Sequence, residues 1–274
     1  MFLSACVQLC SNEDLTHNLD KASAMITRAA QHGAQLIMTP ENTPLLGPKF
    51  HKVDEAQDLS GDIVQYFQAL SKKLKVHLLL GSFAERHYLA DGQLDTKRCY
   101  NTSLMIDDHG EILARYRKIH LFDVDVPQGP SLKESEFICA GDEVMVVDTR
   151  LGKIGMSICY DLRFPELYRA LVDQGAEIIC VPSAFTLTTG KDHWHTLLRA
   201  RAIETQSWIM APGQWGQHDA AGQRQSYGHS LIINPWGTVV ADAGLGEGIC
   251  YAEIDLQQVY KARQAIPLAS HRTL

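Results

Sequence analysis

The N-terminal third of the chain alternates between short apolar runs and apolar stripes at helical spacing. Residues 2–9 alternate weakly between apolar and polar side chains, which predicts a strand. Residues 13–32 carry one apolar stripe, which predicts a helix that Asn12 caps and Gly33 ends. Residues 35–38 predict a short strand, and an apolar stripe over 62–74 predicts a second helix. Residues 76–82 are nearly all apolar, which predicts a strand at the centre of a sheet that is covered on both faces.

Hairpins are predicted in the middle of the chain, because turn residues separate short apolar runs there. The first hairpin joins 101–106 to 111–117, and the second joins 143–149 to 153–158. Between the hairpins, residues 118–142 show little periodicity. A long irregular stretch inside a compact domain is more often functional than idle.

The C-terminal half repeats the alternation of strands and helices. Helices are predicted at 164–174, 192–206 and 256–263. The strands expected among them are 177–181, 207–211, 228–233, 238–241 and 248–254. The two halves have a similar order, with no low-complexity linker between them. We therefore expect an α/β protein with one domain, residues 1–274, in which two mixed sheets pack between helix layers.

Composition and charge exclude several classes of function. The chain has 274 residues and a formal net charge of −7, which argues against binding to nucleic acid or to an anionic membrane. No basic region precedes an apolar run at the start, and no apolar run approaches the roughly 18 residues of a membrane span. The seven cysteines are scattered without a C-x-x-C pair. This predicts neither a disulfide framework nor a zinc site, and favours the cytoplasm.

Three polar residues, Glu41, Lys118 and Cys159, each follow a predicted strand. Cys159 is expected on a strand-to-helix turn, since Pro165 suits the first turn of a helix. Because α/β sheets build their sites at the carboxyl ends of strands, the acid, the ammonium and the thiol are expected to converge. Such a set would make a hydrolase or a transferase that works through a thioester. Taken singly, each residue also has an ordinary explanation: a solvated glutamate, a surface lysine and a buried cysteine.

Three sequence blocks around these residues resemble the signature blocks of the nitrilase superfamily of carbon–nitrogen hydrolases. They are Thr39–Asn42, Tyr116–Asp123 and Cys159–Glu166. The resemblance continues through 181–185, 193–194, 198–204 and 228–230, and so covers essentially the whole chain. It implies a four-layer α-β-β-α sandwich, which agrees with the two halves described above.

The resemblance also implies a role for individual residues. Glu41 would be the general base, Lys118 would stabilise the tetrahedral intermediate and Cys159 would be the nucleophile. A further catalytic glutamate is expected at Glu134, with Glu136 as its rival. Substrate contacts are expected from two further residues, Tyr160, whose backbone N–H would join Lys118 in binding the oxyanion, and Phe185.

The expected substrate is a small amide. Residues 163–167, 190–194 and 227–230 resemble the group of amidases that act on deaminated glutathione, and omega-amidases acting on α-keto-acid amides such as α-ketoglutaramate share much of this pattern. Transfer of the acyl group to an amine and a catalytically silent scaffold on the same fold are the alternatives. Lys133 or Lys191 is expected to bind a substrate carboxylate, whereas Arg199 and Arg201 are expected chiefly in interior ion pairs.

The remaining expectations concern cofactors and assembly. His193 and His195 look like a metal pair, but residues two apart on a helix point to different sides. No metal site and no cofactor is therefore predicted. His120 and His229 are expected to be structural or supporting residues. The apolar residues of the tail 265–274, together with the resemblance, predict a homodimer or a larger homo-oligomer.

Overall fold

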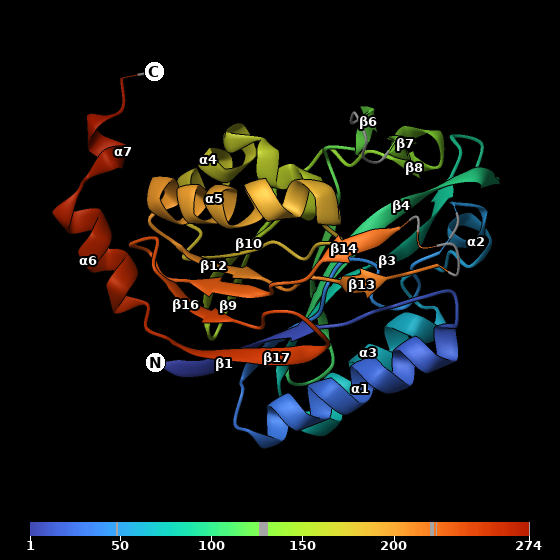
Figure 1. The fold of residues 1–274 in the computed structure, drawn as a ribbon, viewed down its shortest axis with the longest axis horizontal. Helices are drawn as coiled ribbons and strands as arrows, with labels where there is room; N and C mark the ends of the chain where they lie inside the picture. Colours follow the sequence, from blue (N-terminus) through green and yellow to red (C-terminus); the bar gives the residue numbers. More distant parts are fainter. Residues whose placement is uncertain (48, 126–130, 220–221, 223, 274) are drawn as a thin grey trace.

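The computed structural model describes residues 1–47, 49–125, 131–219, 222 and 224–273. Its architecture is four layers, with two β-sheets packed face to face and a pair of helices on each outer face (Figure 1). The expected α-β-β-α sandwich is confirmed. The N-terminal half and the C-terminal half each build most of one sheet.

The first sheet has the order β17-β1-β2-β3-β4-β5, with β8 paired to β4. Its strands are β1 (Phe2–Gln8), β2 (Leu36–Met38), β3 (His77–Tyr88), β4 (Leu94–Ile106), β5 (Ile112–Arg117), β8 (Ile138–Cys139) and β17 (Gly248–Ile254). The helices on its outer face are α1 (Leu15–Gln31) and α3 (Asp62–Leu74). β17 comes from the far end of the chain and pairs antiparallel with β1 over its whole length.

The second sheet has the order β16-β15-β12-β11-β10-β9. Its strands are β9 (Val146–Thr149), β10 (Gly152–Met156), β11 (Ile178–Cys180), β12 (Trp208–Ala211), β15 (Leu231–Ile233) and β16 (Val239–Asp242). The helices on its outer face are α4 (Pro165–Asp173) and α5 (Leu187–Thr205). α6 (Gln257–Ala265) and α7 (Leu268–His271) lie away from the four layers at one end of the molecule (Figure 1).

Short elements surround one end of the two sheets. They are α2 (Lys49–Asp54), β6 (Asp123–Asp125), β7 (Ser131–Lys133), the 3₁₀ helices η1 (Glu134–Glu136) and η2 (Cys159–Arg163), β13 (Trp215–Gln217) and β14 (Gln225–Tyr227). β6 pairs with β7, and β13 pairs with β14. Part of the stretch 118–142, expected to be irregular, therefore forms a small hairpin and a 3₁₀ turn.

The apolar runs of the sequence are explained by burial on both faces of a sheet. In β2, Leu36 and Met38 face the core between the sheets, whereas Ile37 faces the core beneath α1 and α3. The helices supply one apolar side each, such as Ala22 and Ile26 of α1, which are fully buried. Consecutive side chains of a strand point to opposite faces, so a strand covered twice needs apolar residues throughout.

Several predicted boundaries were wrong. The first helix is capped by Asp14, whose side chain accepts a hydrogen bond from the His17 N–H, and not by Asn12. β3 and β4 run well beyond their predicted ends, and α5 starts at Leu187 where 192 was expected. The tail 265–274, for which no helix was predicted, contains α7.

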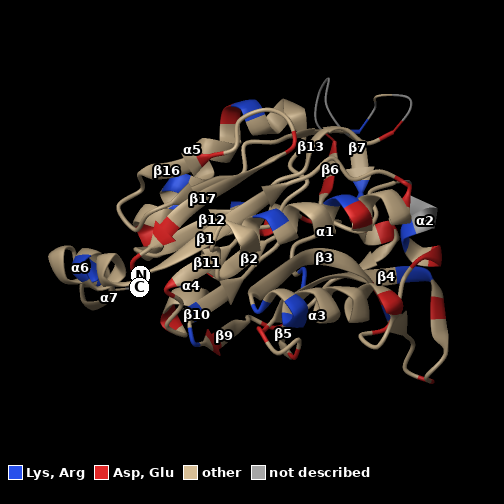
Figure 2. Ribbon diagram, turned by 90° about the horizontal axis from the view of Figure 1, so that it is seen from below, with Lys and Arg blue, Asp and Glu red and all other residues tan. Residues whose placement is uncertain are grey.

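Charged residues of both signs are spread over the whole fold. Lysine and arginine are interspersed with aspartate and glutamate along the ribbon (Figure 2). Within the part of the chain that is described, no helix is both long enough and apolar enough to cross a membrane.

Candidate active site

The ends of three strands bring Glu41, Lys118 and Cys159 into one cavity. Glu41 follows β2 and Lys118 follows β5, both in the first sheet, whereas Cys159 follows β10 of the second sheet. β2 and β5 run in the same direction, because β3 is parallel to β2 and each of the next two pairings is antiparallel. The predicted convergence therefore forms where the carboxyl ends of strands from both sheets meet.

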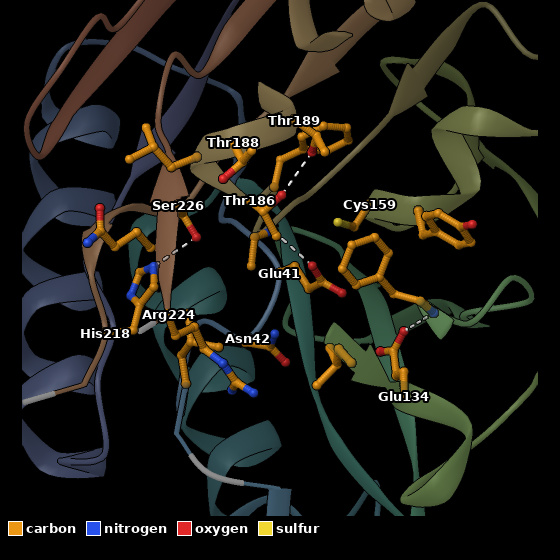
Figure 3. Close-up of a pocket in the computed structure, with 18 of the residues that line it drawn as sticks. Glu41, Asn42, Glu134, Cys159, Thr186, Thr188, Thr189, His218, Arg224 and Ser226 are labelled. Atoms are coloured by element: carbon orange, nitrogen blue, oxygen red, sulfur yellow. Dashed lines mark hydrogen bonds between the residues drawn. The ribbon is translucent and has the colours of Figure 1, made fainter. Parts of the chain in front are cut away.

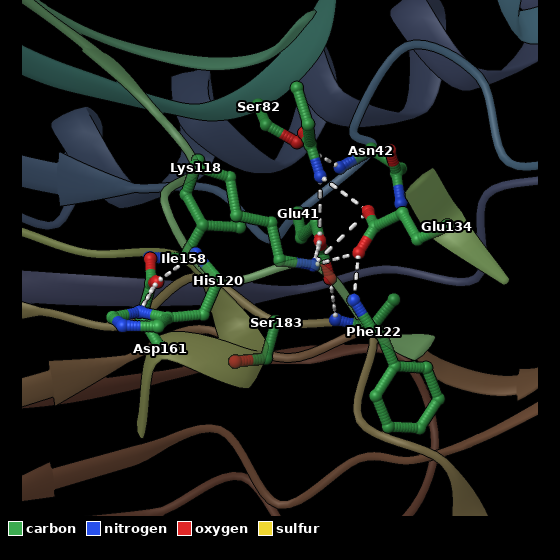
Figure 4. A network of polar contacts seen from close by, with 12 residues as sticks. Glu41, Asn42, Ser82, Lys118, His120, Phe122, Glu134, Ile158, Asp161 and Ser183 are labelled. Atoms are coloured by element: carbon green, nitrogen blue, oxygen red, sulfur yellow. Dashed lines mark hydrogen bonds and ion pairs between the residues drawn. The ribbon is translucent and has the colours of Figure 1, made fainter. Parts of the chain in front are cut away.

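Lys118 is the centre of a buried ion cluster (Figure 4). Its Nζ lies 3.1 Å from Glu41 Oε1 and 2.9 Å from Glu134 Oε2, and its side chain is only 2% exposed. Burial alone would lower the pKa of Lys118, but the charges of Glu134 and Glu41 outweigh it and hold that pKa well above its usual value. Of the two expected glutamates, it is Glu134 that reaches the lysine, while Glu136 is exposed.

Glu41 is held by donors from three parts of the chain. Its Oε1 accepts from Lys118 and from Asn101 Nδ2 at 2.8 Å, and its Oε2 accepts from the Ala184 backbone N–H at 2.8 Å. Burial disfavours the charged carboxylate, but the ammonium of Lys118 outweighs this cost, so the pKa of Glu41 is lowered. The carboxylate is thus ionised at neutral pH. No pattern in the sequence indicates Asn101 or the Ala184 N–H as partners of Glu41.

Cys159 begins the 3₁₀ turn η2 in a strained backbone conformation. Its φ is +49°, in the left-handed region that non-glycine residues seldom adopt, and its backbone N–H donates to Pro182 O at 3.0 Å. Burial, and then the negative charge of Glu41, raise the pKa of the Cys159 thiol well above its usual value. At rest the site therefore pairs a neutral thiol with a carboxylate that can accept its proton.

Asp161 ties this turn to the strand end that carries Lys118. Its fully buried carboxylate accepts from the Ile158 N–H at 2.9 Å, from Tyr116 Oη at 2.7 Å, and from the N–H and Nδ1 of His120 at 3.0 and 2.7 Å. The ring of His120 in turn stacks on Phe164 at 3.7 Å. His120 thus supports the site structurally, as expected, and Asp161 is a residue that the sequence did not single out.

Glu41, Lys118, Glu134 and Cys159 line a cavity of about 850 Å³ (Figure 3). A cavity of this size suits a small-molecule ligand. Tyr160 and Phe185, the two residues expected to contact substrate, both line it. The remaining wall comes from loops and short elements; its members include Asn42, Leu132, Thr186, Thr188, Thr189, His218 and Ser226.

The charged residues of the cavity wall differ from those predicted. Lys133 and Lys191 are both exposed and do not line the cavity. The cations that do line it, besides Lys118, are Lys52, Arg163 and Arg224. Arg201, by contrast, is buried beneath η2, where it donates to Leu162 O and forms an ion pair with Glu204, and this agrees with the expected interior role.

Two groups of side chains outside the cavity place metal-ligand atoms within 4.8 Å of one another. They are His87, Asp95 and Cys139, and His195, His229 and Asp242. In each group a histidine Nδ1 lies 3.0 Å from a carboxylate oxygen of the aspartate, so this histidine and this aspartate already hydrogen-bond to each other. His193 does point away from this cluster, because its Nδ1 contacts Arg163 at 3.3 Å.

Comparison with known proteins agrees with this geometry. The sequence model of the carbon–nitrogen hydrolase family matches residues 3–264, so the chain belongs to that family of enzymes. A deaminated glutathione amidase of Synechocystis is 41% identical over 273 residues, covering 99% of this chain and 98% of that protein. The human deaminated glutathione amidase is 38% identical over 272 residues, covering 98% and 82%.

Solved structures show the same fold. The nitrilase and fragile histidine triad fusion protein of Caenorhabditis elegans superposes with a TM-score of 0.89 at 40% identity; the match covers 99% of this chain and 65% of that one. A Saccharomyces cerevisiae member of branch 10 of the nitrilase superfamily superposes with a TM-score of 0.87 at 33% identity, covering 100% and 97%.

Proposed function

We propose that this chain is an amidase that hydrolyses deaminated glutathione to α-ketoglutarate and cysteinylglycine. The observation that carries the proposal is the buried Glu41–Lys118–Glu134 cluster beside Cys159 in a cavity of about 850 Å³. The identity to amidases of this name, over nearly the whole length of both chains, supports the choice of substrate. The alternative within the family is an omega-amidase that acts on α-ketoglutaramate.

In the proposed first step, Glu41 accepts the proton of the Cys159 thiol as the sulfur attacks the amide carbonyl. The developing oxyanion is stabilised by the ammonium of Lys118 and by the backbone N–H of Tyr160, next to the nucleophile. Glu41 then returns the proton to the leaving amine, and the C–N bond breaks to leave a thioester on Cys159. Glu134 takes part by holding Lys118 in place and balancing its charge.

In the second step, Glu41 takes a proton from a water molecule that attacks the thioester. Collapse of the second tetrahedral intermediate releases the acid and restores the thiol. The raised pKa of Cys159 and the lowered pKa of Glu41 support this order of proton transfers, because the base is ionised while the nucleophile still holds its proton.

The test is a comparison of kcat/KM for deaminated glutathione and α-ketoglutaramate in one assay. We expect the dipeptide amide to be preferred, because contacts to the distant part of a substrate can be used at the reacting centre. If α-ketoglutaramate is equal or better, the omega-amidase alternative replaces this proposal. If neither is hydrolysed and no cysteine is alkylated unusually fast, the chain is a silent scaffold.

We further propose that the single domain, residues 1–274, works as a cytoplasmic homo-oligomer. Apolar side chains at the α6 end of the molecule support self-association, since Trp236 is 61% exposed and Tyr260 is 51% exposed. The seven free cysteines support a reducing compartment.

A further inference from the structure

Three cations of the cavity wall have no ion pair with a described residue. Lys118 contacts two glutamates, but among the described residues no carboxylate lies within ion-pair distance of Arg163, Arg224 or Lys52. This occurs in a chain whose formal net charge is −7. Cations that have no carboxylate partner in a ligand cavity are available to bind an anionic ligand.

Arg163 lies on the side of the cavity that carries the nucleophile. It ends η2, the 3₁₀ helix that Cys159 begins, and four residues of such a helix span about 8 Å. Its guanidinium lies 5.3 Å from the ring centre of Phe185 and contacts His193 at 3.3 Å, so two neighbours hold it in place. The first turn of α5 lines the same wall with Thr188 and Thr189.

Arg224 lies on the other side. Figure 3 places it, with His218 and Asn42, across Glu41 from Cys159. One Nη donates to Gly47 O, and the backbone N–H donates to Asp219, which fixes the start of the side chain. The charges of Asp219, Glu134 and Glu41 act on Arg224, with Asp219 the largest, whereas the guanidinium of Arg163 contacts His193 on α5. The two arginines therefore occupy separate parts of the cavity.

We propose that Arg163 and Arg224 bind the two carboxylates of a dianionic amide, one on each side of the scissile bond. This inference rests on the proposed function. Deaminated glutathione has a carboxylate at the end of its acyl part and another at the end of its dipeptide part. Glu41 returns a proton to the leaving amine, so the amine side of the substrate lies toward Glu41 and, beyond it, Arg224. The acyl part, which stays on Cys159, then extends toward Arg163.

The experiment measures kcat/KM for three amides: deaminated glutathione, α-ketoglutaramate, and deaminated glutathione whose terminal carboxylate is converted to a carboxamide. Arg224→Gln should lower kcat/KM for the first amide about 10- to 100-fold, the range for a lost charged hydrogen bond, and leave the other two within about twofold. Arg163→Gln should lower kcat/KM for all three, because each keeps the acyl carboxylate. Arg163→Lys and Arg224→Lys should restore part of each loss.

Lys133→Gln and Lys191→Gln are matched controls, since both remove a cation near the site that does not line the cavity. They should leave all three values unchanged. The losses from Arg224→Gln and from converting the terminal carboxylate should not add, because both remove one interaction. The assignment would be overturned if Arg224→Gln lowered kcat/KM equally for all three amides, or if Arg163→Gln did not lower it. In either case, hydrolysis of deaminated glutathione by the wild type would still support the proposed function. A wild type that hydrolyses none of the amides refutes both.

Discussion

Replacement of Lys118 by methionine tests the energetics of the buried ion cluster directly. Methionine keeps the apolar stem but removes an ammonium that contacts Glu41 at 3.1 Å and Glu134 at 2.9 and 3.2 Å. Among the described residues, neither buried carboxylate then has a cation within ion-pair distance. Removing one partner of a buried ion pair costs about 3–5 kcal/mol, so we expect a loss of that order in the free energy of unfolding at pH 7.5.

The pH dependence of this loss separates electrostatics from packing. In the variant, Lys118 no longer opposes the effect of burial on Glu41, so the native-state pKa of Glu41 rises above its value in the unfolded chain. A group whose pKa is higher in the folded state binds its proton there first, so stability is regained as pH falls through that pKa. The gap between wild type and Lys118→Met should therefore shrink by at least about 1 kcal/mol between pH 7.5 and pH 5.5.

The assay is urea unfolding followed by the fluorescence of the four tryptophans, at one protein concentration because subunit association shifts apparent stability. Lys153→Met is the matched control: Lys153 is an exposed lysine of β10, and its loss should stay within about 0.5 kcal/mol. A loss for Lys118→Met below about 1 kcal/mol, or one of the same size at both pH values, would refute the view that this lysine holds two buried charges.

Four further predictions concern catalysis, pH and assembly. Cys159→Ala should abolish turnover, and intact-mass analysis of the wild type with a slow substrate should find the acyl adduct on Cys159; full activity of the variant would contradict the nucleophile. Glu41→Gln should remove at least about two decades of kcat in a folded protein, since acid–base assistance is worth about 10²–10⁴, and a loss of a few-fold would count against the base. Burial lowers the pKa of His218 from 6.5 to about 4, so the free energy of unfolding of the wild type should fall by up to about 3 kcal/mol as pH falls from about 6.5 to about 4. His218→Gln should lose less stability over this range in urea unfolding. The same pH dependence in both proteins would show that His218 is not the group responsible. Sedimentation at micromolar concentration should find a dimer or larger species, and a monomer would contradict self-association.

The proposed catalytic groups could be predicted because a polar residue within a few positions of a strand end is a local signal. Glu41, Lys118 and Cys159 each follow a strand in this way, and sheet geometry brings strand ends together. The cavity wall has no comparable signal. Arg224 and Lys52 come from a loop and a short helix far apart in the chain, and neither is preceded by a periodic pattern.

The boundaries that were wrong have physical reasons as well. The outer part of the β3–β4 hairpin carries polar pairs, such as His87 with Asp95 at 3.0 Å, and so lacks the apolar runs by which strands were recognised. The start of α5 was missed because Gly190 reads as a loop residue. It is a helix residue that permits close packing, since a Cβ there would lie 2.4 Å from the Cβ of Tyr227.

The pairing of β17 with β1 has a consequence for how the chain is made. Of the described strands, β1 leaves the ribosome before all others, and β17, its partner on the free side, leaves it after all others. Until Gly248–Ile254 has been synthesised, the backbone of β1 presents an open edge with apolar side chains, which other chains can join. Nascent or prematurely terminated chains that lack β17 would therefore depend on chaperones to avoid aggregation. This holds even for chains in which Glu41, Lys118 and Cys159 have already been translated.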